Sequence, residues 1–273
     1  MTKIKAHRKR RRHDTRKLEV CDATMPPLYE IEVHNFLDAK LPPDARRSFI
    51  ASLQKLASQC LPSVPDYQCL STSSATSLND KLVVLARDSE TQDVMGFFSA
   101  VYLTIDGVGT VIHTGLICIH PTAQRSGLTV QLGTTLFMHI FQAFPDGVWI
   151  TSLAEVPSSL VSIYNFATNV FPSPDLSAPS EVHLRIANDV DKRLRSTMLI
   201  SPNSTFDAKK FVFRESNPIG SPFRKNVDDP LLQHRNKPMT SIVLCSATRG
   251  AMKYCRWLLR IQKRWRRCNL KGC

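Results

Sequence analysis

The spacing of apolar residues predicts a chain in which helices and strands alternate from about residue 30 onward. Apolar residues recur at the spacing of one helix face in four segments, which we predict to be helices: Glu30–Leu41, Ala45–Leu61, Ser126–Phe144 and Pro157–Val170. Short apolar runs bounded by turn residues indicate four strands: Lys81–Arg87, Val94–Ile105, Thr110–His120 and Val148–Val156. The first three strands are separated by short turn-like breaks, which favour an antiparallel meander.

The order of these elements predicts the fold class. Three antiparallel strands followed by a helix, a strand and a further helix indicate an α/β fold of the α+β type, with a mixed, mostly antiparallel central sheet covered by helices. The pattern is weaker beyond residue 172. There it indicates a polar-faced helix at Glu181–Leu199 and strands at Lys209–Arg214 and Thr240–Ser246, with a polar loop at Asn217–Asn236 between the two strands.

The positive charge of the chain is concentrated at its two ends. The formal net charge is +13, of which residues 1–17 contribute +8 and residues 249–273 contribute +9, so the residues between them carry −4. We therefore divide the chain into a basic disordered tail at 1–28, one folded domain at 29–248 with its best support over 80–171, and a basic amphipathic helix at 249–273. We expect the basic ends, rather than the domain, to contact nucleic acid, an acidic protein or an anionic membrane surface.

Both basic ends have a second interpretation. The run His7–His13 is typical of a nuclear-localisation patch, but a solvated arm has the same composition. The segment Met252–Arg267 places two tryptophans and two aliphatic residues on one helical face. That face suits a partner or an anionic membrane surface, and it equally suits docking of the tryptophans on the domain.

Composition and cysteine usage favour an intracellular protein. The eight cysteines are scattered and form no C-x-x-C pair, so they predict neither a disulfide framework nor a metal site. The N-terminus lacks the apolar segment of a secretory signal, and no apolar run reaches the roughly 18–20 residues of a membrane helix. We expect a nuclear or cytoplasmic protein that is neither secreted nor transmembrane and that needs no metal.

The stretch Thr114–Thr129 carries the strongest signal for chemistry. An apolar strand ends at His120-Pro121, a short loop containing Gly127 follows, and an amphipathic helix begins directly after it. The first amides of a helix carry partial positive charge and favour a bound anion. Gly127 lets a phosphate approach the backbone without a Cβ in the way, and Arg125 adds a positive charge. An ordinary strand-to-helix connection has the same outline, so the loop alone leaves both interpretations open.

This stretch resembles motif A of the GNAT superfamily of N-acetyltransferases, which has the pattern Q/R-x-x-G-x-G/A after a strand that ends in aliphatic-x-Pro. Gln124, Gly127 and Thr129 occupy the three key positions, although Thr129 is larger than the family residue and its hydroxyl either crowds or binds a pyrophosphate. The resemblance implies that the pyrophosphate of coenzyme A is held at Gln124, Arg125, Ser126, Gly127, Leu128 and Thr129. It also implies that backbone groups of a bulged strand bind the pantetheine arm, here at Ile117, Cys118 and Ile119.

The resemblance also implies candidate catalytic residues. In histone-type members of the family a carboxylate eleven residues before the motif glutamine is the general base, and His113 occupies that position here. An imidazole suits this task because its ordinary pKa lies near neutrality. Glu155, at the end of the next predicted strand, is a second candidate base. Tyr164 ends a segment, Pro157–Tyr164, that is similar to the family pattern carrying the general acid. A histidine packed on a strand and a tyrosine packed on a helix are the structural alternatives.

Together these features predict a GNAT-like fold and an N-acetyltransferase that uses acetyl-CoA as its co-substrate. The acceptor is an amine of unknown identity, either a small molecule or a protein. The alternative is a relative of the same fold that binds acyl-CoA, nucleic acid or another partner without catalysis.

Overall fold

The computed structural model describes residues 28–36, 41–73, 78–154, 167–172, 178–216 and 239–247. The predicted basic tail at 1–28, apart from Leu28, lies outside these residues. The predicted helix at 249–273 and the predicted loop Asn217–Asn236 lie outside them as well.

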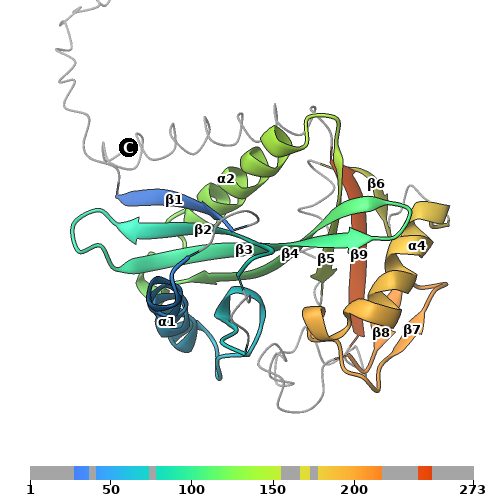
Figure 1. The fold of residues 1–273 in the computed structure, drawn as a ribbon, viewed down its shortest axis with the longest axis horizontal. Coiled ribbons are helices and arrows are strands. Elements are labelled where there is room, and N and C mark those ends of the chain that lie inside the picture. The colour runs from blue at the N-terminus through green and yellow to red at the C-terminus, as the bar shows by residue number, and fades with distance from the viewer. Residues whose placement is uncertain are drawn as a thin grey trace, which may run out of the picture.

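A nine-stranded sheet forms the centre of the described structure (Figure 1). Its strands follow the order β1-β2-β3-β4-β5-β9-β8-β7, and β6 pairs with β9 beside this path. Every ladder is antiparallel except the one between β4 and β5, which is parallel. The strands are β1 (Tyr29–Asn35), β2 (Lys81–Asp88), β3 (Val94–Ile105), β4 (Gly109–Ile119), β5 (Val148–Ala154), β6 (Thr168–Phe171), β7 (Thr205–Asp207), β8 (Val212–Arg214) and β9 (Met239–Ala247). The helices are α1 (Pro43–Cys60), α2 (Leu128–Ala143) and α4 (Glu181–Asp189), with short helical turns η1 (Gln68–Leu70), η2 (Pro121–Ala123), η3 (Val190–Leu194) and η4 (Ser196–Met198).

The structure confirms the predicted fold class and the elements that position the candidate site. β2, β3 and β4 form the predicted meander, with boundaries within one residue of those expected. α1 and α2 confirm the helices predicted at Ala45–Leu61 and Ser126–Phe144, and β5 begins at Val148 as predicted. The elements predicted from the weaker pattern beyond residue 172 are also present. α4 and β8 lie within their predicted segments, and β9 covers the third predicted segment and extends one residue beyond each end of it.

The predicted helix Glu30–Leu41 is wrong, because its first half is a strand. Residues Tyr29–Asn35 form β1 and pair with β2 along their whole length. The apolar residues of this short segment fit one face of a helix, but Ile31 and Val33 also alternate with polar residues at the period of a strand. In the extended form, the backbone N–H and C=O groups of this segment form hydrogen bonds with β2. This pairing favours the strand over the helix.

The helix predicted at Pro157–Val170 also needs a correction at its end. Thr168–Phe171 form β6, which pairs with β9, so a helix cannot extend to Val170. The part of the prediction that precedes Ala167 lies outside the described residues.

Two helices cover opposite faces of the sheet at the end formed by β1 to β4 (Figure 1). In β2, Leu82 and Val84 belong to the apolar cluster under α2, whereas Val83 and Leu85 belong to the cluster under α1. Successive side chains of a strand point to opposite faces, so both sides of β2 are buried. This explains why β2 is a nearly continuous apolar run rather than an alternating one.

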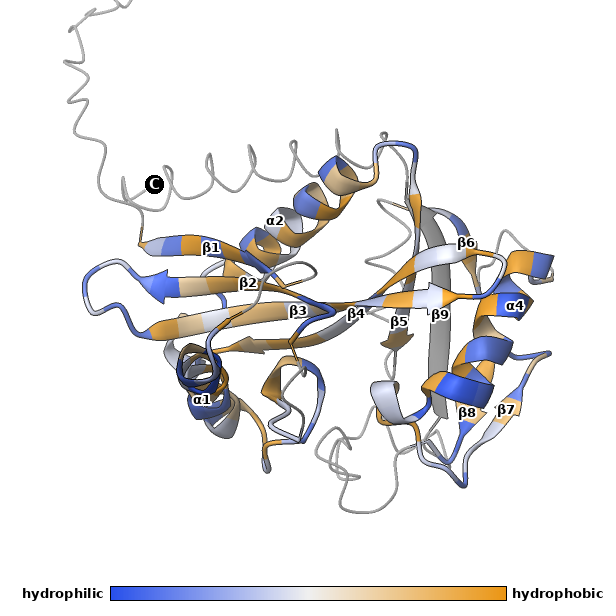
Figure 2. Cartoon of the chain, in the orientation of Figure 1, coloured by the Kyte–Doolittle hydropathy of each residue, from blue (hydrophilic) through white to orange (hydrophobic). Residues whose placement is uncertain are grey.

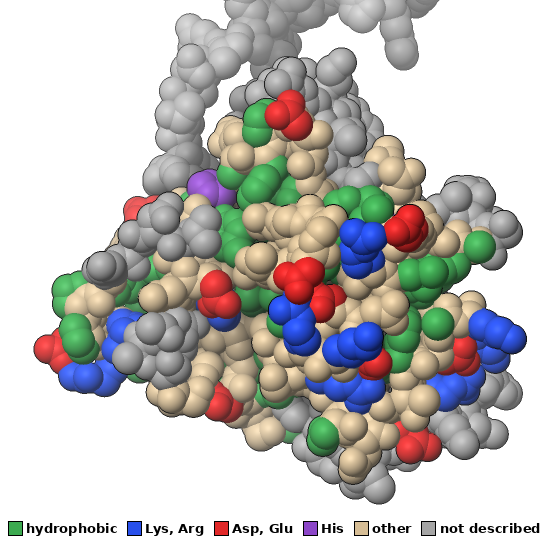
Figure 3. Space-filling model, turned by 45° about the vertical axis from the view of Figure 1, so that its right-hand side comes forward, with side chains coloured by type: hydrophobic (Ala, Val, Ile, Leu, Met, Phe, Trp, Pro, Cys, Tyr) green, Lys and Arg blue, Asp and Glu red, His purple; other side chains and the backbone are tan. Residues whose placement is uncertain are grey.

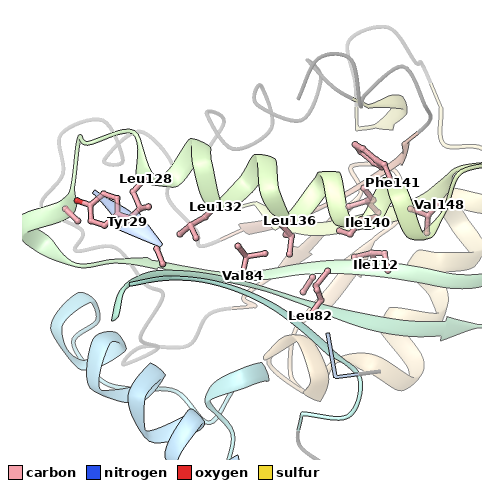
Figure 4. Close-up of a cluster of buried hydrophobic side chains, with 14 of the residues drawn as sticks. Tyr29, Leu82, Val84, Ile112, Leu128, Leu132, Leu136, Ile140, Phe141 and Val148 are labelled. Atoms are coloured by element: carbon pink, nitrogen blue, oxygen red, sulfur yellow. The ribbon is translucent and has the colours of Figure 1, made fainter. Parts of the chain in front are cut away.

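The buried face of α2 holds this helix on the sheet. Leu132, Leu136 and Ile140 are fully buried, and Figure 4 shows them directed at strand residues such as Val84 and Ile112. Their spacing of four residues places them on one side of the helix. Since α2 follows the candidate anion loop directly, this packing also fixes where the loop lies.

We expect the Ile140→Val substitution to lower the free energy of unfolding by about 0.5–1.5 kcal/mol, because it removes one methylene from a fully buried site. Val130→Ala on the same helix is the matched control, since the Val130 side chain is 42% exposed and its truncation leaves no cavity. Urea unfolding of both variants checks the prediction, and equal losses of stability would contradict it.

The opposite end of the sheet has its own apolar layer under α4. Ile186 and Ala187 of α4 pack in one cluster with Phe171, Phe211 and Phe213, which come from or adjoin β6 and β8. Figure 2 shows α1 and α4 with alternating hydrophilic and hydrophobic stretches. This pattern is expected of helices that meet a sheet on one side and solvent on the other.

Charged side chains of both signs are interspersed on the face that Figure 3 brings forward. Arg185 pairs with Glu181 at 2.8 Å and Arg195 pairs with Asp191 at 2.5 Å, in both cases one helical turn apart. The Arg185–Glu181 pair is exposed and contributes about 0–1 kcal/mol. Arg195 is half-buried and also donates to the carbonyls of Ser201 and Ser204, so it ties η3 to the loop before β7. Among the described residues, no helix combines the length and apolar character needed to cross a membrane.

Candidate functional site

The two central strands β4 and β5 run side by side for only part of their length. Their parallel ladder ends at Thr114↔Ser152, although β4 continues to Ile119. β5 remains paired with β9 over its whole length. The strands therefore part after Thr114, and within the described structure Ile117, Cys118 and Ile119 of β4 pair with β3 but not with β5. We refer to this point as the fork.

A β-bulge in β4 lies at the fork. The register between β3 and β4 shifts so that Gly115 and Leu116 together lie opposite Ser99 of β3. A bulge re-aims the backbone groups and side chains of the strand that carries it. A bulged strand is what the family resemblance implied for the pantetheine arm, and the bulge directly precedes the three residues predicted to bind that arm.

Those three residues differ in exposure. The Ile117 side chain is 37% exposed, which is unusual for a large apolar residue on a central strand. Cys118 is buried, and burial raises the pKa of its thiol, so the neutral thiol is held away from nucleophilic chemistry. The Ile119 carbonyl accepts a hydrogen bond from the Cys60 thiol at 3.3 Å, which ties the end of α1 to β4.

The loop from Gln124 to Thr129 has the geometry of an anion site. Gly127 is the N-cap of α2 in the left-handed region at φ 81°, and no side chain caps the helix. The first N–H groups of a helix have no partner within the helix, so those of Leu128 and Thr129 point out of its N-terminus. Arg125 also adopts a left-handed conformation at φ 63°, and its side chain is exposed two residues before Gly127. The loop therefore offers backbone donors and a cation within a few residues of each other, which suits an anion.

The remaining predicted loop residues have more specific local roles. The Ser126 hydroxyl donates to the Ala123 carbonyl at 2.7 Å, so it braces the loop. Gln124 and Thr129 are exposed. Ile119 and Leu128 lie together over Gly96 of β3, where a Cβ would come within 3.0 and 3.1 Å of them. The structure thus places the end of β4 directly beside the first turn of α2.

His113 lies in β4 just before the fork and is only 1% exposed. Its Nε2 lies 3.2 Å from the Tyr67 hydroxyl, and its Nδ1 has no hydrogen-bond partner. Burial lowers the pKa of His113 to about 4, although the backbone carbonyl of Thr151 opposes this at a geometry short of a hydrogen bond. The imidazole is therefore neutral at neutral pH.

A buried polar network connects His113 to the loop that follows α1. The Gln68 side-chain amide donates to the Tyr67 hydroxyl at 2.7 Å, and the Ser99 hydroxyl donates to Gln68 Oε1 at 2.7 Å. The Leu116 carbonyl oxygen, inside the bulge, lies 3.3 Å from the same Ser99 hydroxyl and is the alternative acceptor for its hydrogen. The sequence pattern gave no sign of this network, because Tyr67 and Gln68 lie in a segment rich in proline, serine and threonine that is typical of a loop.

Two predicted catalytic residues, Glu155 and Tyr164, lie outside the described residues. Their roles as candidate base and candidate acid therefore stay predictions. Within the described part of the chain, no group of three or more His, Cys, Asp or Glu side chains is arranged to hold a metal ion.

We expect the Gly115→Ala substitution to lower the free energy of unfolding by about 1–3 kcal/mol, because a Cβ at this position would overlap the Gln68 side-chain amide. Gln68→Ala should relieve part of this loss in the double variant, since it removes the overlapping group. A double-mutant cycle by chemical denaturation measures this coupling. Additive losses would show that the amide and the bulge do not touch in solution.

The order of the elements around the fork decides the fold. A meander leads through a bulged strand into the candidate anion loop and α2, and a parallel strand then returns beside the bulged one and parts from it. This is the arrangement that the resemblance implied. The chain has a GNAT-like fold. The structure brings the loop 124–129 and the backbone of residues 117–119 to the same end of β4.

Several solved structures are similar to the GNAT-like fold of this chain. A GNAT family N-acetyltransferase (YhbS) from Escherichia coli in complex with CoA matches 52% of this chain and 71% of its own, with 17% identity and a TM-score of 0.38. The NatC complex bound to Gag peptide and CoA matches 48% and 79%, with 18% identity and a TM-score of 0.35. The aminoglycoside 6'-N-acetyltransferase AAC(6')-Ih from Acinetobacter baumannii matches 50% and 86%, with 17% identity and a TM-score of 0.33. No protein-family model and no curated protein sequence matches the chain.

Proposed function

We propose that this protein is an acetyl-CoA-dependent N-acetyltransferase. The observation that carries the proposal is the N-terminus of α2, which has no side-chain cap and has Gly127 in the left-handed conformation, set beside the end of β4 that extends past its ladder with β5. The loop amides and Arg125 suit the pyrophosphate of coenzyme A. The backbone of Ile117 to Ile119, which has no β5 partner, suits the amide-bearing pantetheine arm.

The reaction transfers an acetyl group from sulfur to nitrogen. The amine nitrogen forms a bond with the thioester carbonyl carbon, and the carbonyl oxygen takes negative charge in the tetrahedral intermediate. The bond between carbon and sulfur then breaks, and the thiolate leaves with the electron pair. One proton leaves the nitrogen and one proton reaches the sulfur, so the reaction needs an acceptor and a donor of protons near the thioester.

We assign the proton donor to Tyr164, by its position in the segment after β5. Glu155 is the remaining candidate base, because it is the next residue in the sequence after Ala154, where β5 ends. His113 is less suited to this task, since its side chain is buried and its pKa is depressed well below neutrality. A base whose pKa lies far below the working pH accepts a proton weakly.

We expect the Gly127→Glu variant to bind acetyl-CoA at least tenfold more weakly, about 1.4 kcal/mol or more. The substitution places a carboxylate beside the pyrophosphate and forces a side chain into a left-handed backbone position. Isothermal titration calorimetry with purified protein measures the effect.

Gly109→Glu is the matched control for this experiment. Gly109 also has a positive φ, of 94°, a Cβ there meets nothing within 4 Å, and the residue lies at the opposite end of β4. Both variants therefore gain the same charge and comparable backbone strain. Equal affinity in the two variants, with circular dichroism spectra like the wild type, would mean that coenzyme A does not bind at this loop.

A protein of this fold that binds acetyl-CoA without transferring it is the second candidate. The burial of His113 favours it, because the residue at the family's base position does not reach solvent. An amine acceptor screen that follows release of free CoA separates the two functions. Binding without release against small amines and peptide amines would support the second candidate.

A further inference from the structure

A buried glutamine packs directly on the bulge of β4. Gln68 lies in η1, the short turn that follows α1, and it is 5% exposed. A Cβ added at Gly115 of the bulge would come within 1.7 Å of Gln68 Oε1 and within 2.1 Å of the carbon and nitrogen of the same amide. The Gln68 amide therefore fills the space that a side chain at position 115 would need, in contact with the strand backbone.

Two hydroxyl groups hold the Gln68 amide in this place. One end of the amide lies 2.7 Å from the Tyr67 hydroxyl oxygen, and the other end lies 2.7 Å from the Ser99 hydroxyl oxygen. Since a hydroxyl can donate and accept, these contacts suit either orientation of the amide. Ser99 is the residue of β3 opposite the bulge, and its hydroxyl oxygen lies 3.3 Å from the Leu116 carbonyl oxygen. The bulge is thus contacted from both η1 and β3.

The backbone of Gln68 points to a specific role for its side chain. Its φ is 48°, in the left-handed region that residues with a side chain seldom adopt. Such a conformation persists only where the surrounding structure enforces it. Glycine would adopt this backbone freely, so the local turn does not require a glutamine. The contacts that do require it are those of its amide with the bulge and the two hydroxyls.

Beyond the bulge, alternate backbone groups of β4 face the edge that β5 leaves open. The His120 amide donates to the Met95 carbonyl at 2.9 Å, so these residues form a hydrogen-bonded pair between β4 and β3. Hydrogen-bonded and non-hydrogen-bonded pairs alternate along an antiparallel ladder. Ile117 and Ile119 are therefore in non-hydrogen-bonded pairs, and their N–H and C=O groups point away from β3. The Ile119 carbonyl accordingly accepts from the Cys60 thiol of α1.

The bulge decides which residues have this direction. It places Gly115 and Leu116 opposite one residue of β3, so the alternation after the bulge is out of step with the alternation before it. Without the extra residue, Ile117 and Ile119 would exchange direction with Cys118. The position of the bulge therefore determines which N–H and C=O groups lie at the open edge of β4.

We propose that Gln68 is a positioning residue for acetyl-CoA, whose side chain holds the β4 bulge and, through it, the backbone groups that receive the pantetheine arm. The inference rests on the proposed acetyltransferase function. Gln68 acts through the bulge and does not touch acetyl-CoA, because it is buried between η1 and the sheet. The turn after α1 and the pantetheine site are coupled in this way.

The test separates the two parts of acetyl-CoA. Adenosine 3′-phosphate 5′-diphosphate carries the pyrophosphate of coenzyme A without the pantetheine arm, so its affinity reports on the loop 124–129 alone. We expect Gln68→Ala to bind acetyl-CoA about tenfold more weakly, the scale of one lost hydrogen bond, and to bind the nucleotide within about twofold of the wild type. Calorimetric titrations of both ligands give the ratio of the two affinities.

Gln54→Ala is the matched control. The Gln54 side-chain amide donates to the Leu70 carbonyl at 2.8 Å, so the variant loses the same side chain from a contact with the same turn. It should keep the wild-type ratio. An unchanged ratio in Gln68→Ala, or an equal change in both variants, overturns the inference and leaves the proposed function standing. A wild type that binds neither ligand overturns the proposed function and the inference with it.

Nuclear magnetic resonance of the wild type labelled with ¹⁵N-glutamine tests the same inference without a variant. We expect acetyl-CoA, but not the nucleotide, to shift the side-chain amide resonances of Gln68, because only the pantetheine arm contacts the strand beyond the bulge. The Gln54 amide is the internal reference and should respond to neither ligand. Equal shifts of the Gln68 amide with both ligands, or no shift with acetyl-CoA, would contradict the inference.

Discussion

Replacing His113 by glutamine is expected to flatten the dependence of stability on pH between about 6.5 and 4. Burial lowers the pKa of His113 in the folded protein to about 4, whereas an unfolded histidine titrates near 6.5. Between these values the unfolded chain binds a proton that the folded chain does not, so the wild type loses stability as the pH falls. The full effect of this one residue is about 3 kcal/mol, and it is absent above pH 7.

Urea denaturation of the wild type and His113→Gln at pH 7, 5.5 and 4 measures this contribution. The glutamine variant retains a polar side chain opposite Tyr67. For each protein, the free energy of unfolding at pH 5.5 and pH 4 is compared with that protein's own value at pH 7. The pKa of His183 is also lowered by burial, and His183 stays in both proteins, so its effect cancels in the comparison. Identical slopes would mean that the His113 ring is hydrated in solution.

Tyr164→Phe is expected to bind acetyl-CoA with nearly wild-type affinity and to transfer the acetyl group roughly 10²–10⁴ times more slowly. The substitution removes only the hydroxyl that we assign to protonation of the departing thiolate, and losses of this size are usual for a general acid. Turnover is followed by release of free CoA with an amine acceptor found in the screen described above.

Tyr29→Phe is the control for this prediction. Tyr29 is buried in the cluster under α2, and the variant loses the same hydroxyl at a place far along the sheet from the fork. Its turnover should stay within a few-fold of the wild type. A normal rate in Tyr164→Phe would remove the acid from the scheme and leave protonation of the thiolate to solvent.

The parts of the fold that were predicted correctly are those in which local pattern and final environment agree. α2 has an apolar stripe long enough to establish a helical period, and β2 to β4 are apolar runs separated by short turns. β1 was mistaken for a helix because seven residues are too few to separate a period of 2 from one of 3.6, and pairing with β2 settled the matter.

The candidate site was predictable only where it is continuous in the sequence. The loop 124–129 follows its strand directly, so its role could be inferred from order alone. The Tyr67 and His113 side chains, by contrast, meet across 46 residues, and those of Gln68 and Ser99 meet across 31. No periodicity encodes such pairs, because they join side chains that only the tertiary fold brings together.

The pairing of β5 with β9 affects the order in which the chain can fold during synthesis. All residues of β1 to β4 and α2 have been synthesised once the ribosome has passed residue 143, and the ladders of β2 with β3 and of β3 with β4 join consecutive strands. β5 then has β4 on one side, but its other edge waits for residues 239–247. Until they emerge, a strand in the middle of the final sheet has an open edge, which other chains can pair with. A nascent chain stalled before Met239 is therefore a natural substrate for chaperones, and truncation there should favour aggregation over a smaller stable domain.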